Sequence, residues 1–210
     1  MESAASNDSV DRKIEFWFDF SSPYAYFAAH EIDGRMERLG RTVVWRPFLL
    51  GAVFRLTGMA PLVTMPMRGA YACRDWDRIA KILAVPFQLP DTHPYPSQMV
   101  ARAYYWLADH HADSAKPFAQ AAFAEHFVNQ KTLVTSGIVT ALAERFIADT
   151  APLTAWLGSA DAKDALRART QEAVAKGVFG SPFFIAGGEP FWGWDRIPML
   201  EEWLRHSHQA

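Results

Sequence analysis

The sequence predicts an α/β fold in which strand-forming segments near the two ends of the chain enclose a long block of helices. Residues 13–48 have the pattern strand, helix, strand, and residues 182–205 have the pattern strand, strand, helix. Between residues 51 and 176 we find no convincing strand, whereas apolar residues recur at helical spacing. The predicted order is therefore βαβ, a large all-helical insertion, and then ββα.

The first βαβ unit is predicted from three adjoining segments. "KIEFWFDF", residues 13–20, alternates in character and is rich in aromatic residues, as strands are. From Pro23 to Leu39 the apolar residues recur at helical spacing, and Gly40 closes this helix. "TVVWRPF", residues 42–48, is rich in β-branched residues and forms the second strand. Strand, helix, strand implies parallel pairing with a right-handed crossover.

The middle of the chain is expected to contain helices and loops rich in proline. Prolines divide its first part, at Pro61, Pro66, Pro86, Pro90, Pro94 and Pro96. Helical periodicity then predicts helices at Met99–His111, Pro117–Asn129, Ser136–Ala148 and Ala160–Lys176.

Strand character returns in "PFFIA", residues 182–186, and "EPFWG", residues 189–193. Gly187-Gly188 lies between these segments and indicates a hairpin, because glycine adopts the positive φ angles of tight turns. The segment from Asp195 to Arg205 has the spacing of an amphipathic helix.

These patterns divide the chain into three parts. Residues 1–12 are expected to form a flexible tail, residues 13–50 and 177–210 one sheet domain, and residues 51–176 a helical insertion domain. A length of 210 residues, half of them hydrophobic, suits one domain with a large insertion.

The composition indicates which kinds of partner the protein binds and where in the cell it is located. The formal net charge of −2 does not indicate binding to nucleic acid or to an anionic membrane. The polar N-terminus lacks the apolar core of a secretory signal, and no apolar run approaches the roughly 20 residues that cross a bilayer. We therefore expect a soluble, cytoplasmic protein without a membrane or nucleic-acid partner.

Cysteine and histidine usage limits the redox and metal chemistry. The single cysteine, Cys73, can form neither an internal disulfide nor a CxxC redox pair. The seven histidines are scattered and lack the spacing of a metal-binding motif, so we expect no metal site.

Ser22 follows the first predicted strand and precedes Pro23, and this pair marks the start of a helix. Serine is a favoured N-cap and proline is favoured at the first helical position, so Ser22 can act simply as a cap. The same position also suits an anion, because a helix N-terminus carries partial positive charge and unpaired N–H groups. A serine hydroxyl there can donate to a thiolate, which lowers the pKa of the thiol.

"FDFSSPYAY", residues 18–26, resembles the start of the active-site helix in disulfide oxidoreductases of the DsbA type, which have a thioredoxin-like fold. In that family a CxxC motif opens the helix, whereas Ser22 and Ala25 occupy the cysteine positions here, so no redox couple can form. A serine in the first position is similar to kappa-class glutathione transferases and 2-hydroxychromene-2-carboxylate isomerases. The resemblance extends from about Lys13 to Leu204 and implies that the sheet domain is thioredoxin-like.

"GVFGSPFF", residues 177–184, resembles the loop that contains a cis-proline in thioredoxin-like proteins. The resemblance implies a cis Ser181-Pro182 bond, with the Ser181 backbone facing the Ser22 hydroxyl across a cleft. In the family, the residue before this proline pairs with the glutathione backbone like an added strand, so Ser181 and Pro182 are candidate glutathione-binding residues. The local pattern is also compatible with a plain turn between a helix and a strand.

"FWGWDR", residues 191–196, resembles the "WGxDR" motif of the same family. The resemblance implies that Asp195 binds the α-ammonium group of glutathione, with Arg196 as a second contact or as a salt-bridge partner. The alternative role of Asp195 is an N-cap at the start of the last helix.

Other polar positions depart from the family pattern or have two readings. Many relatives carry Asn-x-Pro followed by a lysine, whereas here Met59 precedes Ala60-Pro61 and Arg68 stands in place of the lysine. Arg68 can bind a carboxylate through its planar guanidinium and is a candidate glutathione-binding residue. Ser97 lies near a position where relatives often have asparagine. Asp19 is either a loop cap or a group that transfers protons.

The resemblance implies a glutathione-dependent isomerase that interconverts 2-hydroxychromene-2-carboxylate and trans-o-hydroxybenzylidenepyruvate, or a related aromatic oxo-acid, in aromatic compound catabolism. Ser22 would be the catalytic residue, holding the glutathione sulfur as a thiolate that adds reversibly to a conjugated carbon. Relatives are commonly homodimers, which implies a homodimer here. A kappa-like glutathione S-transferase is the nearest alternative, and a non-catalytic thioredoxin-fold chaperone or ligand-binding protein is an alternative of another class.

Overall fold

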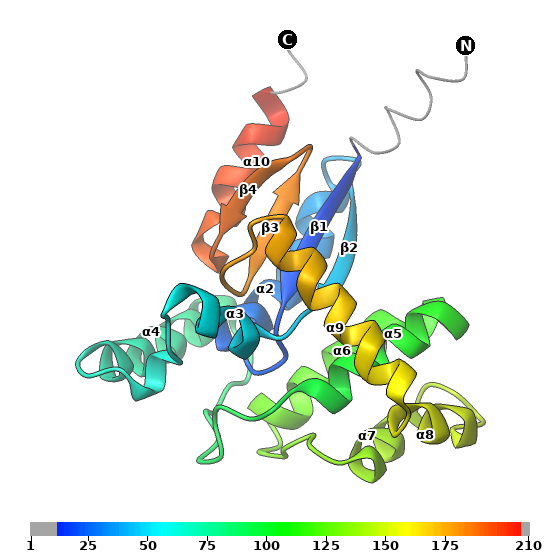
Figure 1. Ribbon diagram of the computed structural model, residues 1–210. Coiled ribbons are helices and arrows are strands. Elements are labelled where there is room, and N and C mark those ends of the chain that lie inside the picture. The colour runs from blue at the N-terminus through cyan, green and yellow to red at the C-terminus, as the bar shows by residue number, and fades with distance from the viewer. Residues whose placement is uncertain (1–11, 207–210) are drawn as a thin grey trace, which may run out of the picture.

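Residues 12–206 of the chain are described by a computed structural model (Figure 1). The predicted N-terminal tail, apart from Arg12, lies outside the described residues, as do residues 207–210. Within the described part, no helix is both long enough and apolar enough to cross a membrane.

Within the described chain the strands form one mixed sheet, in the order β2-β1-β3-β4. β1 (Lys13–Phe18) pairs in parallel with β2 (Thr42–Pro47), as the predicted βαβ unit requires. β3 (Phe183–Ala186) pairs antiparallel with β1 and with β4 (Glu189–Trp192), which follows it through the predicted glycine turn. The predicted thioredoxin-like arrangement of the two end segments is confirmed.

Helices make up the rest of the regular structure. In the end segments, α2 (Pro23–Glu37) follows β1, and α10 (Ile197–His206) follows β4 after the 3-10 turn η2 (Trp194–Arg196). Between β2 and β3 lie α3 (Leu50–Thr57), η1 (Leu62–Thr64), α4 (Arg68–Leu83), α5 (Gln98–His110), α6 (Ala112–Phe127), α7 (Ser136–Ala143), α8 (Ala151–Leu157) and α9 (Ala160–Ala175). Residues 51–176 are all described and form no strand, as predicted.

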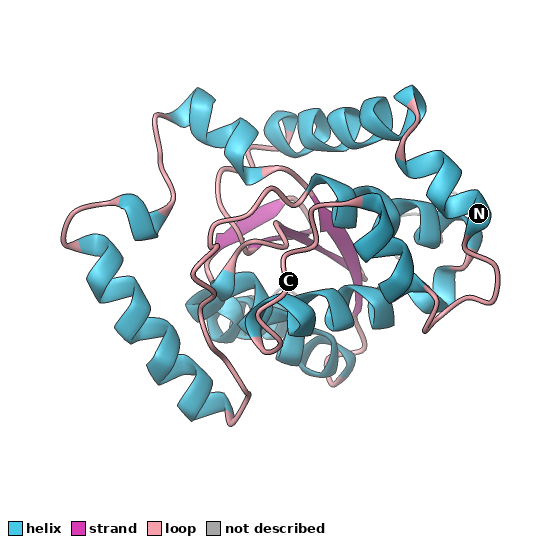
Figure 2. Ribbon diagram, turned by 90° about the horizontal axis from the view of Figure 1, so that it is seen from below, coloured by secondary structure: helices cyan, strands magenta, loops and turns pink. Residues whose placement is uncertain are grey.

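Both faces of the sheet are covered by helices (Figure 2). Side chains of a strand alternate between faces, so Phe16 and Trp17 of β1 enter different parts of the core. Phe16 stacks on Phe184 of β3 and meets Trp45 of β2 edge to face, with ring centroids 5.3 and 5.2 Å away, in the cluster that includes α2. Trp17 packs on the opposite side with Val53 of α3 and Ala173 of α9. β1 is therefore buried on both faces, which explains its aromatic sequence.

Several helix boundaries differ from the predicted ones. α6 begins at Ala112, so Pro117 lies inside the helix and does not start it. The segment predicted as one helix to Ala148 ends at Ala143, and a separate helix, α8, follows it. α3, α4 and α8 lie outside the predicted helix ranges. α3 and α8 have eight and seven residues, which is too short for a clear periodic signal, because such helices depend on tertiary packing.

Two tyrosines of α5 attach the insertion to the outer edge of the sheet. Tyr104 Oη donates to the Trp45 carbonyl at 3.1 Å, and Tyr105 Oη donates to the Pro47 carbonyl at 2.8 Å. Burial raises the pKa of both phenols, so both remain protonated donors at neutral pH. These bonds satisfy two carbonyl groups of an edge strand that would otherwise lack partners.

We expect Tyr105→Phe to lower the free energy of unfolding by about 1–3 kcal/mol, because it leaves the buried Pro47 carbonyl without its donor. Urea unfolding followed by tryptophan fluorescence measures this change. Tyr71→Phe is the matched control, since Tyr71 is 62% exposed. If the two variants lose equal stability, the bond from Tyr105 does not hold the insertion to the sheet.

Candidate functional site around Ser22

Ser22 caps α2 and also contacts a loop that is remote in sequence. Its Oγ accepts a hydrogen bond from the Ala25 N–H at 3.3 Å and donates one to the Ser181 carbonyl at 2.8 Å. The capping role is therefore present, with Pro23 at the first helical position as predicted. The hydroxyl also donates a hydrogen bond to a group outside the helix, at the helix end that carries partial positive charge.

The Ser181-Pro182 bond is cis, as predicted, and the loop that contains it faces the start of α2. Ser181 takes part twice, because its carbonyl accepts from Ser22 and its Oγ accepts from the Asp19 N–H at 2.9 Å. The two serines are in direct contact and are not separated by the expected cleft. Ser22 and Ser181 are only 7% and 9% exposed, so a ligand can bind to these groups only if it breaks the hydrogen bond between them. A second cis bond, at His93-Pro94, was not predicted.

Asp19 organises the loop between β1 and α2. Its Oδ1 accepts from the Ser21 N–H at 2.8 Å, the Ser21 hydroxyl at 2.9 Å and the Ser97 hydroxyl at 2.7 Å. Its Oδ2 accepts from the Leu50 N–H at 2.9 Å. The side chain is buried, and both oxygens are occupied by donors. This arrangement favours the structural role of Asp19 over proton transfer.

Ser97 has a role that the sequence did not indicate. It precedes α5 in the N-cap position, but its side chain makes no capping bond and instead donates to Asp19. Thr170 of α9 likewise accepts the Leu49 N–H at 3.2 Å, beside the Leu50 amide that binds Asp19. The only local signal was the D-x-S pattern of Asp19 and Ser21, which is typical of a side chain that caps its own loop.

Asp195 lies next to the cis-proline loop, and it does not cap the last helix, which was its alternative role. Gly193 occupies the cap position of η2, and α10 begins only at Ile197. The Gly193 N–H donates to the Pro182 carbonyl at 3.0 Å, so this turn and the loop are joined. Gly193 has φ of 112°, and a Cβ there would lie 2.6 Å from Asp195 Oδ1. Glycine is therefore required for this position of the carboxylate.

The Asp195 carboxylate is exposed and forms an ion pair with Arg196, with Nη2 and Oδ2 separated by 3.4 Å. Arg196 is thus a salt-bridge partner of Asp195, one of its two predicted roles. Asp195 also acts on Tyr24, the second residue of α2. Burial raises the pKa of Tyr24 most, followed by the bond that its hydroxyl donates to Asp75, and the charge of Asp195 adds to the effect. This influence means that Asp195 lies within electrostatic reach of the start of α2.

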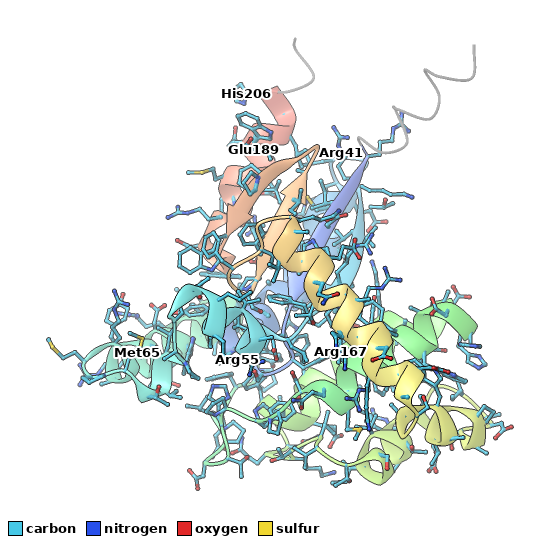
Figure 3. The ribbon with its side chains drawn as sticks, in the orientation of Figure 1. Arg41, Arg55, Met65, Arg167, Glu189 and His206 are labelled. Atoms are coloured by element: carbon cyan, nitrogen blue, oxygen red, sulfur yellow. The ribbon has the colours of Figure 1, made fainter. Side chains whose placement is uncertain are left out.

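Arg68 stands apart from the other predicted residues. It is the exposed first residue of α4, and within residues 12–206 no hydrogen bond or ion pair joins its side chain to Ser22, Ser181 or Asp195. Met65, three residues earlier, lies on the lobe that α4 forms beside the sheet (Figure 3). The role of Arg68 as a glutathione contact therefore remains a prediction.

We expect Asp19→Asn to destabilise the protein by about 2–3 kcal/mol. The amide NH₂ group of asparagine would face an N–H or O–H group that now donates a hydrogen bond to the carboxylate. Chemical unfolding measures the loss. Asp91→Asn is the matched control, since Asp91 is exposed. Similar stability of both variants would contradict the structural role of Asp19.

Comparison with known proteins agrees with this topology. A family model described as "DSBA-like thioredoxin domain" matches residues 13–205. The chain is 25% identical over 204 residues to glutathione S-transferase kappa 2 of Caenorhabditis elegans, with 91% of each protein covered. It is 24% identical over 203 residues to 2-hydroxychromene-2-carboxylate isomerase of Sphingobium xenophagum, with 93% of this chain and 99% of that protein covered.

Solved structures show the same fold. A structure of a 2-hydroxychromene-2-carboxylate isomerase aligns with a TM-score of 0.83 and 22% identity, covering 94% of this chain and 96% of the other. The family model spans both end segments and the whole insertion. On this evidence, the chain belongs to the DSBA-like thioredoxin domain family.

Proposed function

We propose that the protein is a glutathione-dependent isomerase of a small aromatic oxo-acid, in which Ser22 holds the glutathione sulfur as a thiolate. The observation that carries this proposal is the hydrogen bond from the Ser22 hydroxyl to the Ser181 carbonyl. An O–H donor, the positive end of a helix and a backbone carbonyl meet at this point. Each of the three can stabilise one part of a cysteine-containing peptide.

The chemistry at Ser22 is electrostatic. Glutathione would supply a nucleophilic sulfur that adds reversibly to a conjugated carbon, so that a double bond becomes a single bond that can rotate. Ser22 donates its hydroxyl to that sulfur, and the N-terminus of α2 favours the negative charge, so the thiol loses its proton more readily. Ala25 removes the competing disulfide chemistry, because it occupies the place of a resolving cysteine.

The cis-proline loop completes the proposed binding mode. A hydroxyl has one hydrogen to donate, so Ser22 must leave the Ser181 carbonyl when it donates to sulfur. A backbone N–H of the peptide ligand then takes its place on the carbonyl, as in an added strand. The exchange leaves no buried group without a partner, while Pro182 holds the loop at the start of α2.

Charged residues would hold the two ends of the ligand. Asp195 binds the α-ammonium group of the γ-glutamyl unit, and Arg196, already beside it, is a second contact with that unit. Arg68 binds a carboxylate of the ligand through its guanidinium. Two observations support this role of Asp195: its side chain is exposed, and its charge contributes to the raised pKa of Tyr24 at the start of α2.

A glutathione S-transferase is the second candidate, favoured by the similarity to the kappa 2 enzyme of Caenorhabditis elegans. Both candidates use the same thiolate and differ in whether the sulfur leaves again. Incubation with glutathione and 2-hydroxychromene-2-carboxylate tests the isomerase, because isomerisation consumes no glutathione. Formation of a stable conjugate with 1-chloro-2,4-dinitrobenzene, without isomerisation, would favour the transferase.

We expect Ser22→Ala to lower the glutathione-dependent rate by about 100-fold, as the loss of one preorganised donor does in other active sites. The loss of the cap should cost only about 1 kcal/mol of stability. Ser159→Ala is the matched control, because Ser159 caps α9 with a bond of 3.1 Å to the Ala162 N–H. Equal rates in the two variants would refute the assignment of Ser22.

We expect Asp195→Asn to weaken glutathione binding about tenfold, since a charged hydrogen bond to the ligand is lost. Calorimetric titration measures the affinity. The analogue of glutathione that lacks the α-amino group is the control ligand, and it should bind the variant and the unaltered protein equally. A tenfold loss for both ligands would mean that Asp195 acts through the loop and not on the ammonium group.

A further inference from the structure

A cavity of about 580 Å³ lies between α3, α5 and α9, outside the site described above. Apolar side chains form much of its wall, among them Leu49, Leu166 and Val174. Figure 3 labels Arg55 on α3 and Arg167 on α9, and both of these residues line it. Its volume falls within the usual range of sites for small molecules.

The charged residues that line this cavity are all cations. They are Arg55, Arg102, Lys163 and Arg167, although the chain as a whole has 21 cationic and 23 acidic residues. Arg167 pairs with Asp164 of its own helix. Within residues 12–206, Arg55, Arg102 and Lys163 have no carboxylate at ion-pair distance. The cavity therefore has a positive potential that the protein itself does not neutralise.

Arg102 of α5 has the least solvent of these cations. Burial lowers its pKa, and no acidic group opposes the effect. Its Nε is buried without a hydrogen-bond partner in the described chain, and its Nη1 meets only the Met99 sulfur, at 3.8 Å. A thioether is a weak acceptor, and removal of a guanidinium from water without an anion is unfavourable. An anionic ligand would supply the missing partner.

We infer that this cavity binds an anionic amphiphile, with one carboxylate or sulfonate group held by Arg102 and an apolar body packed on Leu166 and Val174. Arginine suits such a head group because its planar donors match two oxygens at once. The carbon stems of Arg55 and Lys163 can cover the apolar body while their charges stay in water. A fatty acid of medium length or an aryl carboxylate has this chemistry.

The inferred site goes beyond the proposed function. Neither Ser22 nor the cis-proline loop lines the cavity. Leu49 and Thr170 line the cavity and are joined by a hydrogen bond. Leu50, which follows Leu49, donates a hydrogen bond from its N–H group to Asp19. The backbone at Leu49 and Leu50 therefore separates the cavity from the loop that carries Ser22.

Fluorescence titration with 8-anilinonaphthalene-1-sulfonate tests the inference in the full-length protein. Laurate should displace this probe at least tenfold more effectively than dodecan-1-ol, which has the same chain without the charge. Arg102→Gln should weaken probe binding at least tenfold. Arg38→Gln is the matched control, because Arg38 is an exposed arginine at the end of α2 and outside the cavity, and it should bind as the unaltered protein does.

A second pair of variants protects the test if Arg102→Gln fails to fold. Leu56 lines the cavity and is 69% exposed, so its replacement does not disturb the core. Leu56→Glu should weaken probe binding through charge repulsion, and Leu56→Gln should not.

The inference is overturned if Leu56→Glu binds the probe as well as Leu56→Gln, or if a folded Arg102→Gln variant keeps full affinity. Equal competition by laurate and dodecan-1-ol would also overturn it, because the head group would then have no partner. Loss of probe binding in Ser22→Ala, or displacement of the probe by glutathione, would assign the probe to the Ser22 site instead.

Discussion

The buried carboxylate of Asp19 is the constraint on which the candidate site depends. Its side chain receives hydrogen bonds from Leu50 and Ser97, at the starts of α3 and α5. Its backbone carbonyl accepts the Ser22 N–H, and its backbone N–H donates to the Ser181 hydroxyl. One residue at the end of β1 therefore fixes two helices of the insertion and both serines, and an uncompensated carboxylate at this depth would be strongly destabilising.

The parts of this site that were predictable are those that local sequence determines. A strand that runs into Ser22-Pro23 specifies a capped helix within a few residues, and the Gly-Gly turn specifies its hairpin in the same way. The partners of Asp19 could not be read in this manner. Leu50, Ser97 and Ser181 lie 31, 78 and 162 residues away from it in the chain, and no short pattern links them.

The same distinction explains the errors in the helical insertion. Helical periodicity placed the start of a helix at Pro117, a residue that the first turn of a helix accepts. Pro117 lies inside α6 because Ala115 before it and Phe118 after it are both buried, and their packing outweighs the lost backbone bond. α8 has only seven residues but buries Leu153 and Leu157 completely. Tertiary packing thus decides these boundaries, which periodicity alone cannot show.

The single hydrogen of the Ser22 hydroxyl makes a demand on any thiol ligand of the proposed site. When the Ser22 hydroxyl turns to a sulfur, the buried Ser181 carbonyl loses its donor. This loss costs about 1–3 kcal/mol unless another donor binds the carbonyl. A simple alkyl thiol has no group that can replace it. A peptide thiol does, because the N–H of a cysteinyl unit lies a few bonds from its sulfur. In the proposed function, therefore, the Ser22–Ser181 bond discriminates between peptide thiols and other thiols before Asp195 makes any contact.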